Sequence, residues 1–290
     1  MAAGRLAESV PGVAGFEARY RAAQRRSRVA LLAGAVLLGA AIHLAATASE
    51  FSLGRLARSL PRIADYVVLT LPELDAATFA ADVAYWYYDF PRWLGLLLDT
   101  ALIGGIATVL GAAGGLALAL LGARNLMHSY AANFVFRRVA EAARTVPETV
   151  YALVLVVAFG VGPLAGIAAI AFHSAGALGK LWAEVIENVD PGPLDGVRCA
   201  GANHSEIIRF SVIPQVIQEL TGYALWRLEL NIRAAAIVGF VGAGGIGQEL
   251  YQAVSLGYYE DVSAIVLLVV LVVAAIDVVC DRLRRRGAPS

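Results

Sequence analysis

Four polar residues interrupt an otherwise apolar segment of this chain. Arg227, Glu229, Asn231 and Arg233 lie within the stretch 215–238, whose apolar character predicts a membrane-spanning helix. Charged side chains at membrane depth are costly and usually pair or face water. Glu229 and Arg233 are four residues apart, so they can form an ion pair along one helix face. Two interpretations follow: an ion pair that fixes packing, or an anion path contacted by Arg227 and Arg233, since guanidinium groups bind oxyanions in bidentate fashion.

Three further polar residues, His173, Ser174 and Lys180, lie in another predicted span. A lone histidine on a packed helix usually bonds a neighbour, so a packing role for His173 stands beside a substrate role for His173 and Ser174. Lys180 can extend its ammonium toward an interface. An intramembrane enzyme using Glu184, Glu187 and His173 is a competing class, but the spacing gives no nucleophile–base pair. The sequence also lacks a Walker lysine motif and metal-ligand spacing, so we predict no catalysis, no cofactor and no metal.

The composition places these residues in a membrane. Of the 290 residues, 59% are hydrophobic, the mean hydropathy is +0.68 and the net charge is zero, whereas a soluble domain is roughly 45–50% apolar. The neutral charge gives no footprint for nucleic acid. The stretch 29–48 is long enough to cross about 30 Å of hydrocarbon, and 94–121 and 263–276 are the other clear apolar runs. Since termini on one side require an even number of crossings, we assign six spans, at 29–48, 94–122, about 146–160, 164–187, 215–238 and 261–281. The third is short, and it can take length from the amphipathic stretch 130–143, with Pro147 as a kink or boundary.

Arginines at the two ends of the chain orient these spans. One group precedes the first span and another follows the last: Arg19, Arg21, Arg25, Arg26 and Arg28, then Arg282, Arg284, Arg285 and Arg286. Positive residues near span ends mark the cytoplasmic side, so we predict a cytoplasmic segment 1–28 and a cytoplasmic tail 282–290. Residues 1–28 are too polar for a signal peptide, and we expect the first span to be retained. Cys199 and Cys280 then lie beside cytoplasmic arginines, where we expect no disulfide.

The segment 29–93 comprises the first span and a predicted external loop over 49–93. Aromatic residues crowd the end of this loop, at Tyr85, Trp86, Tyr87, Tyr88, Phe90 and Trp93. An aromatic belt where the chain re-enters the membrane is one explanation. A contact surface for an external partner is the other.

A polar segment over 192–214 separates the fourth and fifth spans and is predicted to be cytoplasmic. Pro191 and Pro193 can open a short helix, because proline is tolerated in a first turn. Gly201 can adopt the left-handed conformation that ends one helix and redirects the chain. Residues 203–210 can form a second helix, and Pro214 restarts the fifth span. Such a protruding elbow suits the groove of a soluble partner, whereas a plain connecting loop of this length is uncommon.

The spacing in this elbow resembles a pattern of ABC importer permeases: Glu-Ala-Ala, three residues, glycine, nine residues, then Ile-x-Leu-Pro. The corresponding segments here are Asp195-Gly196-Val197, Gly201 and Ser211-Val212-Ile213-Pro214. The spacing matches throughout, and identity holds at Gly201 and Pro214. The resemblance implies a coupling helix that inserts into a separate ATPase subunit. The coupling residues would be Asp195, Arg198, Ala200, Gly201, Ala202 and Pro214.

Longer stretches resemble the permease subunit of phosphonate transporters, at 144–163, 187–193 and 226–250, and the likeness covers most of 94–281. The resemblance implies an all-α polytopic membrane protein with about six transmembrane helices, like the type I ABC importer permeases. The transmembrane domain would be 94–281, with its coupling elbow at 192–214. The implied setting is a bacterial inner membrane, with a second copy of the chain, two ATPase subunits and an extracytoplasmic substrate-binding protein.

The implied function is ATP-driven import of phosphonate or a related phosphorus oxyanion such as phosphate or phosphite. The hypothesised pathway residues are Arg227, Glu229, Asn231, Arg233, His173 and Ser174. Permeases for methionine share the glycine-rich stretch over 242–248, so an importer for such an amino acid is an alternative. A passive channel is a third class.

That glycine-rich stretch contains Gly242, Gly244, Gly245 and Gly247. The spacing also fits the G-x-G-x-x-G of dinucleotide sites, with Asp261 downstream, but its flanks are membrane segments rather than strands of a βαβ unit. We expect the glycines to permit a tight reversal and close helix packing. The family resemblance places them near the dimer axis and the external gate.

Overall fold

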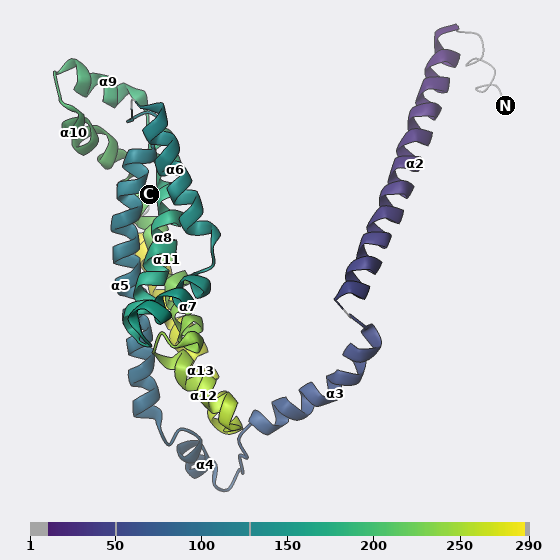
Figure 1. Cartoon of the computed structure of the whole chain (residues 1–290), viewed down its shortest axis with the longest axis vertical. Coiled ribbons are helices and arrows are strands. Elements are labelled where there is room, and N and C mark those ends of the chain that lie inside the picture. The colour runs from purple at the N-terminus through teal and green to yellow at the C-terminus, as the bar shows by residue number, and fades with distance from the viewer. Residues whose placement is uncertain (1–10, 50, 128, 288–290) are drawn as a thin grey trace. The chain divides into compact units, whose positions relative to one another are not determined.

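The computed structural model describes residues 11–49, 51–127 and 129–287, and every regular element in these residues is a helix (Figure 1). The predicted all-α fold is therefore confirmed. The chain divides into two compact units, residues 1–67 and 68–290, and each is described by itself. The first holds α2 (Pro11–Ala48) and most of α3 (Leu53–Thr70). The second holds α4 (Phe79–Trp86), α5 (Phe90–Gly122), α6 (Tyr130–Thr145), α7 (Glu148–Phe159), α8 (Pro163–Glu187), α9 (Pro191–Cys199), α10 (His204–Ile207), α11 (Ile213–Val238), α12 (Ile246–Leu256) and α13 (Tyr259–Gly287).

The described helices provide four to six candidate membrane spans. Four single helices are long and apolar enough to cross a membrane, within α2, α5, α8 and α13. Two bent pairs raise the number to six, α6 with α7 and the segment His204–Val241 with α12. The third predicted span corresponds to α7, whose 12 residues reach only about 18 Å. The stretch 130–143 does not lengthen it in line, because α6 and α7 meet at 88°, and Pro147 lies at this boundary.

Close packing of α5 against α8 forms the centre of the second unit. A Cβ added to Gly111 would lie 2.6 Å from the Cβ of Ser174, and one on Gly115 would lie 2.9 Å from the Cβ of Leu178. Lipid tails are as apolar as leucine, so helices in a membrane associate through such close van der Waals contact rather than through hydrophobic burial. The glycines of α5 therefore set how near its backbone comes to α8.

The aromatic segment before α5 fastens the start of α13. The Trp86 indole donates to the Glu260 carbonyl and the Ser263 hydroxyl, each at 3.1 Å, and the Tyr88 hydroxyl donates to Asp261 at 3.1 Å. Burial and the Asp261 carboxylate raise the pKa of Tyr88 above its ordinary value. Trp93 is only 1% exposed. Part of the aromatic cluster is thus internal packing, which neither interpretation of the sequence anticipated.

The elbow between α8 and α11 has the predicted helix–glycine–helix form. Asp190 caps α9 by accepting from the Gly192 N–H at 2.9 Å. Gly201 has φ +83° and open space around it, so the left-handed backbone, rather than crowding, calls for glycine there. Asn203 starts α10 with a reciprocal capping box to Glu206. The helix then continues without a break through the π turn Ile208–Val212 into α11. The prediction that Pro214 restarts the fifth span is therefore wrong, since the span is already helical from His204.

The glycine-rich segment bends the chain less than predicted. The helix ending at Val241 and the following α12 meet at 45°, so the predicted tight reversal at 242–247 is wrong. Positive φ angles at Gly242, Gly244 and Gly245 permit a bend but fix no direction, and the connection to α13 comes only at Gly257 and Tyr258. The segment is held from outside instead: the Ile246 N–H donates to the Thr100 hydroxyl at 2.9 Å.

Gly247 offers a test of this packing. We expect Gly247→Ala to lower the free energy of unfolding by about 3 kcal/mol, because its Cβ would lie 1.9 Å from the Ala236 carbonyl oxygen and overpacking has costs of this order. Gly222→Ala in α11 is the control, since nothing lies within 4 Å of its added Cβ. Thermal unfolding of the purified protein in detergent measures both, and equal midpoints would contradict the packing described.

A second test concerns the buried hydroxyl of Ser211. This residue occupies the position where the importer pattern has isoleucine. Its hydroxyl is buried without a hydrogen-bond partner among the described residues. We expect Ser211→Ala to raise the free energy of unfolding by about 1 kcal/mol by removing an unsatisfied group. Ser174→Ala should have the opposite effect, since that buried hydroxyl contacts Asn231 and Arg227. Thermal unfolding distinguishes them, and a loss at both positions would contradict the assignment for Ser211.

Candidate functional site

A chain of polar contacts crosses three packed helices at the level of Arg227. The Arg227 Nε donates to the Ser174 hydroxyl at 3.0 Å, and its Nη2 lies 2.5 Å from His173 Nδ1. Ser174 in turn donates to the Asn231 Oδ1 at 3.0 Å, and the Asn231 Nδ2 donates to the Thr108 hydroxyl at 2.9 Å. Ser174 and Asn231 are 0% and 1% exposed. The structure thus brings together four of the six hypothesised pathway residues, from α8 and α11, and joins them to α5.

His173 connects this site to the break between α6 and α7. Its Nε2 lies 3.2 Å from the Arg144 carbonyl oxygen, and its Nδ1 lies 3.6 Å from the Glu148 carboxylate as well as beside Arg227. A neutral imidazole with its proton on Nε2 satisfies both hydrogen bonds, donating to Arg144 and accepting from Arg227. Glu148 then supplies the negative charge nearest to the ring. The cationic site is therefore bordered by a carboxylate at the hinge of a broken span.

The other two hypothesised residues form a separate group. Arg233 pairs with Glu229 along α11, as the spacing predicted, and its Nη2 also lies 3.8 Å from Asp277 in α13. Two carboxylates therefore surround one guanidinium. The arrangement joins α11 to α13 and leaves Arg233 with less unbalanced positive charge than Arg227.

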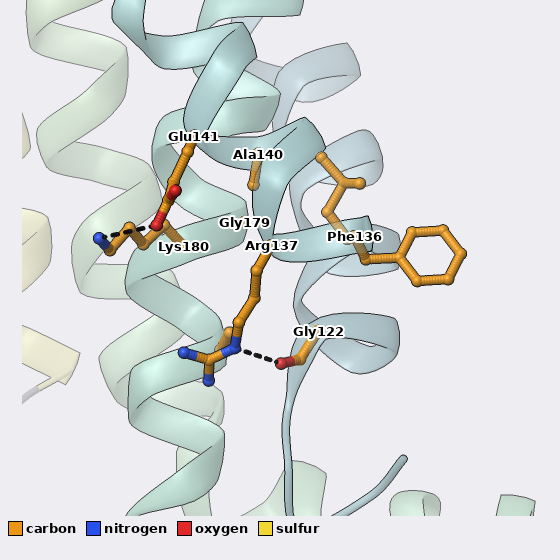
Figure 2. Close-up of a pocket in the computed structure, with 9 residues that line it drawn as sticks. Gly122, Phe136, Arg137, Ala140, Glu141, Gly179 and Lys180 are labelled. Carbon is orange, nitrogen blue, oxygen red and sulfur yellow. Dashed lines mark hydrogen bonds and ion pairs between the residues drawn. The ribbon is translucent and has the colours of Figure 1, made fainter. Parts of the chain in front are cut away.

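Lys180 contributes to a small polar corner between α6 and α8. Its ammonium lies 3.6 Å from Glu141, and Arg137, which lines the same corner, extends away from it to donate to the Gly122 carbonyl (Figure 2). The cavity here has a volume of about 20 Å³. That is room for a single water molecule, so this corner is too small for a substrate.

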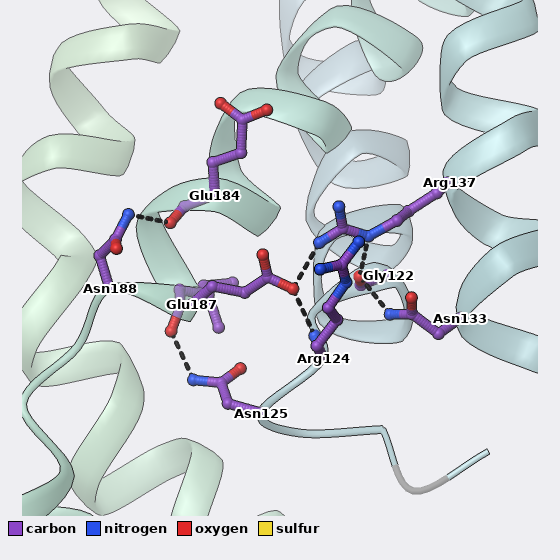
Figure 3. A network of polar contacts seen from close by, with 9 residues as sticks. Gly122, Arg124, Asn125, Asn133, Arg137, Glu184, Glu187 and Asn188 are labelled. Carbon is purple, nitrogen blue, oxygen red and sulfur yellow. Dashed lines mark hydrogen bonds and ion pairs between the residues drawn. The ribbon is translucent and has the colours of Figure 1, made fainter. Parts of the chain in front are cut away.

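A denser network joins the ends of α5 and α8, as Figure 3 shows. The Glu187 carboxylate accepts from the Arg124 backbone N–H at 2.6 Å and pairs with Arg137. The Gly122 carbonyl accepts from Asn133 and from Arg137. Carbonyls at a helix C-terminus lack partners within the helix, and these side chains supply them. The network fixes the end of α8 directly before the elbow.

This network also bears on the alternative of an intramembrane enzyme. Glu187 is engaged by Arg137 and Arg124, and it is 14 positions along α8 from His173, roughly 21 Å at the helical rise. The structure therefore does not bring the proposed polar groups together. Among the described residues, no group of His, Cys, Asp or Glu side chains has the arrangement of a metal site.

The elbow exposes one side and anchors the other. Leu194 and Ile207 are buried in a cluster with Trp182 and Ile186 of α8. Asp195 and Arg198 form an exposed ion pair at 3.3 Å on α9. Ala200 and Gly201 are also exposed, whereas Ala202 is half-buried and Pro214 lies in the first turn of α11. The elbow thus presents an exposed face, on which Phe210 lies beside the polar residues, and a base packed against α8.

Sequence reasoning missed the residues that complete these sites. Glu148 and Thr108 contact the pathway cluster from α7 and α5, and Arg137 reaches Glu187 across 50 positions. The spacing of residues in the sequence indicates none of these contacts, because each one depends on how the helices pack. A glutamate directly after Pro147, at an expected kink, was the single local hint.

Comparison with known proteins agrees with this architecture. Residues 111–289 match the family described as "Binding-protein-dependent transport system inner membrane component". The putative phosphite transport system permease protein HtxC of Stutzerimonas stutzeri is 38% identical over 240 residues, covering 81% of this chain and 79% of its own length. The phosphate-import permease protein PhnE of Mycolicibacterium smegmatis is 35% identical over 198 residues, covering 68% of this chain and 37% of its own.

Solved structures share the fold at lower identity. A chain of the MetNI methionine ABC transporter, in an inward-facing conformation, has a TM-score of 0.60 and 22% identity, covering 68% of this chain and 96% of its own. A chain of a bacterial ABC transporter involved in alginate import has a TM-score of 0.60 and 14% identity, covering 86% and 98%. This chain therefore belongs to the family of binding-protein-dependent transport system inner membrane components and has the fold of the ABC importer permeases.

Proposed function

We propose that this chain is the transmembrane permease subunit of an ATP-driven importer for a phosphorus oxyanion such as phosphonate, phosphite or phosphate. The observation that carries this proposal is the Arg227 guanidinium, which lies in a buried set of polar groups within an apolar helix. Relatives named as phosphite and phosphate permeases support the substrate class. An importer of an amino acid such as methionine is the alternative, supported by the glycine-rich stretch over 242–248 and by fold similarity.

Arg227 is suited to bind an oxyanion because an anion can replace its present hydrogen-bond partners. A neutral imidazole and a hydroxyl occupy its donors, and a phosphorus oxyanion offers stronger, charge-assisted acceptors in the same planar arrangement. Glu148, beside His173, would neutralise the site while it is empty and repel an anion that enters it. Binding and release would then depend on the bend between α6 and α7, which carries Glu148.

Import would require partners that this chain does not contain. The exposed elbow over 192–214 would dock an ATPase subunit on each of two copies, with both chain termini cytoplasmic, and an external binding protein would deliver the substrate. A second copy would pack against an open apolar groove of about 550 Å³ between α5 and α11, which is lined by Gly105, Thr108, Ala224 and Leu228 among others. Thr108 also ends the polar chain from Arg227, so the groove borders the proposed pathway.

The role of Arg227 can be tested by charge-neutral replacement. We expect Arg227→Gln to reduce uptake of radiolabelled phosphite or methylphosphonate about 10–100-fold, since hydrogen bonds to a charged group contribute about 1.5–3 kcal/mol. Arg233→Gln is the matched control and should reduce uptake less, because Glu229 and Asp277 already neutralise that charge. Uptake is measured in proteoliposomes with the assembled importer. Transport that survives replacement of both arginines would exclude the anion path.

The elbow can be tested through Gly201. We expect Gly201→Val to lower the substrate transported per ATP hydrolysed, because a β-branched residue at φ +83° forces the elbow out of its shape. Gly196→Ala is the control, since its Cβ meets nothing within 4 Å and alanine is the residue of the importer pattern. ATP hydrolysis and uptake are measured together. Normal coupling in a Gly201→Val complex that retains its ATPase would remove the elbow from the mechanism.

A further inference from the structure

Helix α3 (Leu53–Thr70) carries two opposite stripes. Arg55, Arg58 and Arg62 are spaced three and four residues apart and therefore share one face. Large apolar residues at the same spacings line the opposite face, at Leu53, Leu56, Leu60, Ile63 and Val67. No residue of α3 is buried, and Leu53 and Leu60 are 72% and 57% exposed. A continuous apolar stripe of this length needs a covering medium, because leaving it in water is unfavourable.

The chain keeps α3 close to the end of a candidate membrane span. The apolar span within α2 ends at Ala48, and α3 begins five positions later, which allows at most about 17 Å even when fully extended. The turn is in fact tight: the Phe51 N–H donates to the Ala46 carbonyl at 2.8 Å, and the Ser49 N–H to Ala45 at 2.9 Å. When α2 crosses a bilayer, α3 therefore starts at its surface.

The orientation of that span does not by itself explain the arginines of α3, because they lie at the opposite end of the span from the first arginine group. Arg19, Arg21, Arg25, Arg26 and Arg28 precede the apolar part of α2, and the α3 arginines follow it. Positive charge is normally concentrated on one side of a span. Arg58 and Arg62 are exposed, and Asp65 is the single acidic residue of the helix. A local anionic partner would account for this second cluster of arginines.

We propose that α3 is an interfacial helix that lies in the membrane surface and binds anionic phospholipids. Its apolar stripe enters the boundary between headgroups and acyl chains, roughly 5–10 Å deep, as in other amphipathic interfacial helices. Its arginine stripe faces outward along the headgroups, where each guanidinium can contact phosphodiester oxygens. The Pro61 side chain projects between the two stripes, so this proline interrupts neither of them.

Spin-label accessibility in the assembled importer tests the lipid contact. Labels are placed at Leu56→Cys and Ile63→Cys on the apolar stripe, and at Arg58→Cys and Arg62→Cys on the arginine stripe, in a background with Cys199→Ser and Cys280→Ser. The complex is reconstituted in liposomes containing phosphatidylglycerol. We expect collisions with oxygen, relative to a water-soluble nickel chelate, to be several-fold more frequent on the apolar stripe. Nickel access to both stripes would mean a solvated helix and would overturn the proposal.

Other occupants of the stripe give different results. Loss of access to both reagents at Leu56 and Ile63 would indicate a covering protein, and spin–spin broadening between identical labels would indicate a second copy of α3. Either result would overturn lipid insertion.

A second measurement tests the headgroup contact. With the label at Ile63, phosphatidylglycerol should give deeper insertion than phosphatidylcholine. The double variant Arg58→Gln/Arg62→Gln should lose most of that difference, whereas Asp65→Asn, which removes the opposing charge, should increase it. Equal insertion in both lipids for the parent protein would overturn the contact with anionic headgroups.

Discussion

A charge inside hydrocarbon has to be hydrogen-bonded or paired, and Arg227 places that requirement on three helices at once. Its guanidinium contacts Ser174 and His173 on α8, and the chain continues through Asn231 to Thr108 on α5. These contacts require α5, α8 and α11 to keep one register. The small side of α5 makes that register possible, because Gly111 lies directly against Ser174. The close packing of α5 against α8 thus also brings together the polar groups that are hydrogen-bonded around Arg227.

The same helices connect this polar centre with the elbow. One helical run extends from His204 through the π turn into α11, and the proposed anion contact lies on it. On the other side, three residues link α8 to α9, and α8 carries His173 and Ser174. Leu194 and Ile207 pack the elbow onto the end of α8, where Glu187 is pinned by Arg137. A force applied to the elbow would therefore reach the site along two helices rather than through a flexible loop.

Features set by local chemistry were predictable from the sequence, and features set by helix packing were not. Pro191 and Gly201 marked the elbow correctly because proline and glycine restrict or free the backbone at their own positions. Pro214 did not, because the helical run from His204 passes through it without a break. The Glu229–Arg233 pair followed from helical spacing. The angle at Gly242–Gly247 did not, since glycine permits many directions and contacts such as that between Thr100 and Ile246 select one. Glu148 was equally hidden, because an 88° bend brings it to His173.

The two arginines of α11 illustrate why residue type alone cannot assign a pathway. They lie six positions apart on one helix, yet their surroundings differ in charge. Arg233 has two carboxylates within 4 Å, so an arriving anion would have to displace a resident negative charge or bind beside it. Arg227 has a hydroxyl and an imidazole as direct partners, with the Glu148 carboxylate beyond the ring. An oxyanion can replace neutral partners at smaller electrostatic cost than charged ones. The groups that already surround each cation therefore favour Arg227 over Arg233 as the proposed anion contact.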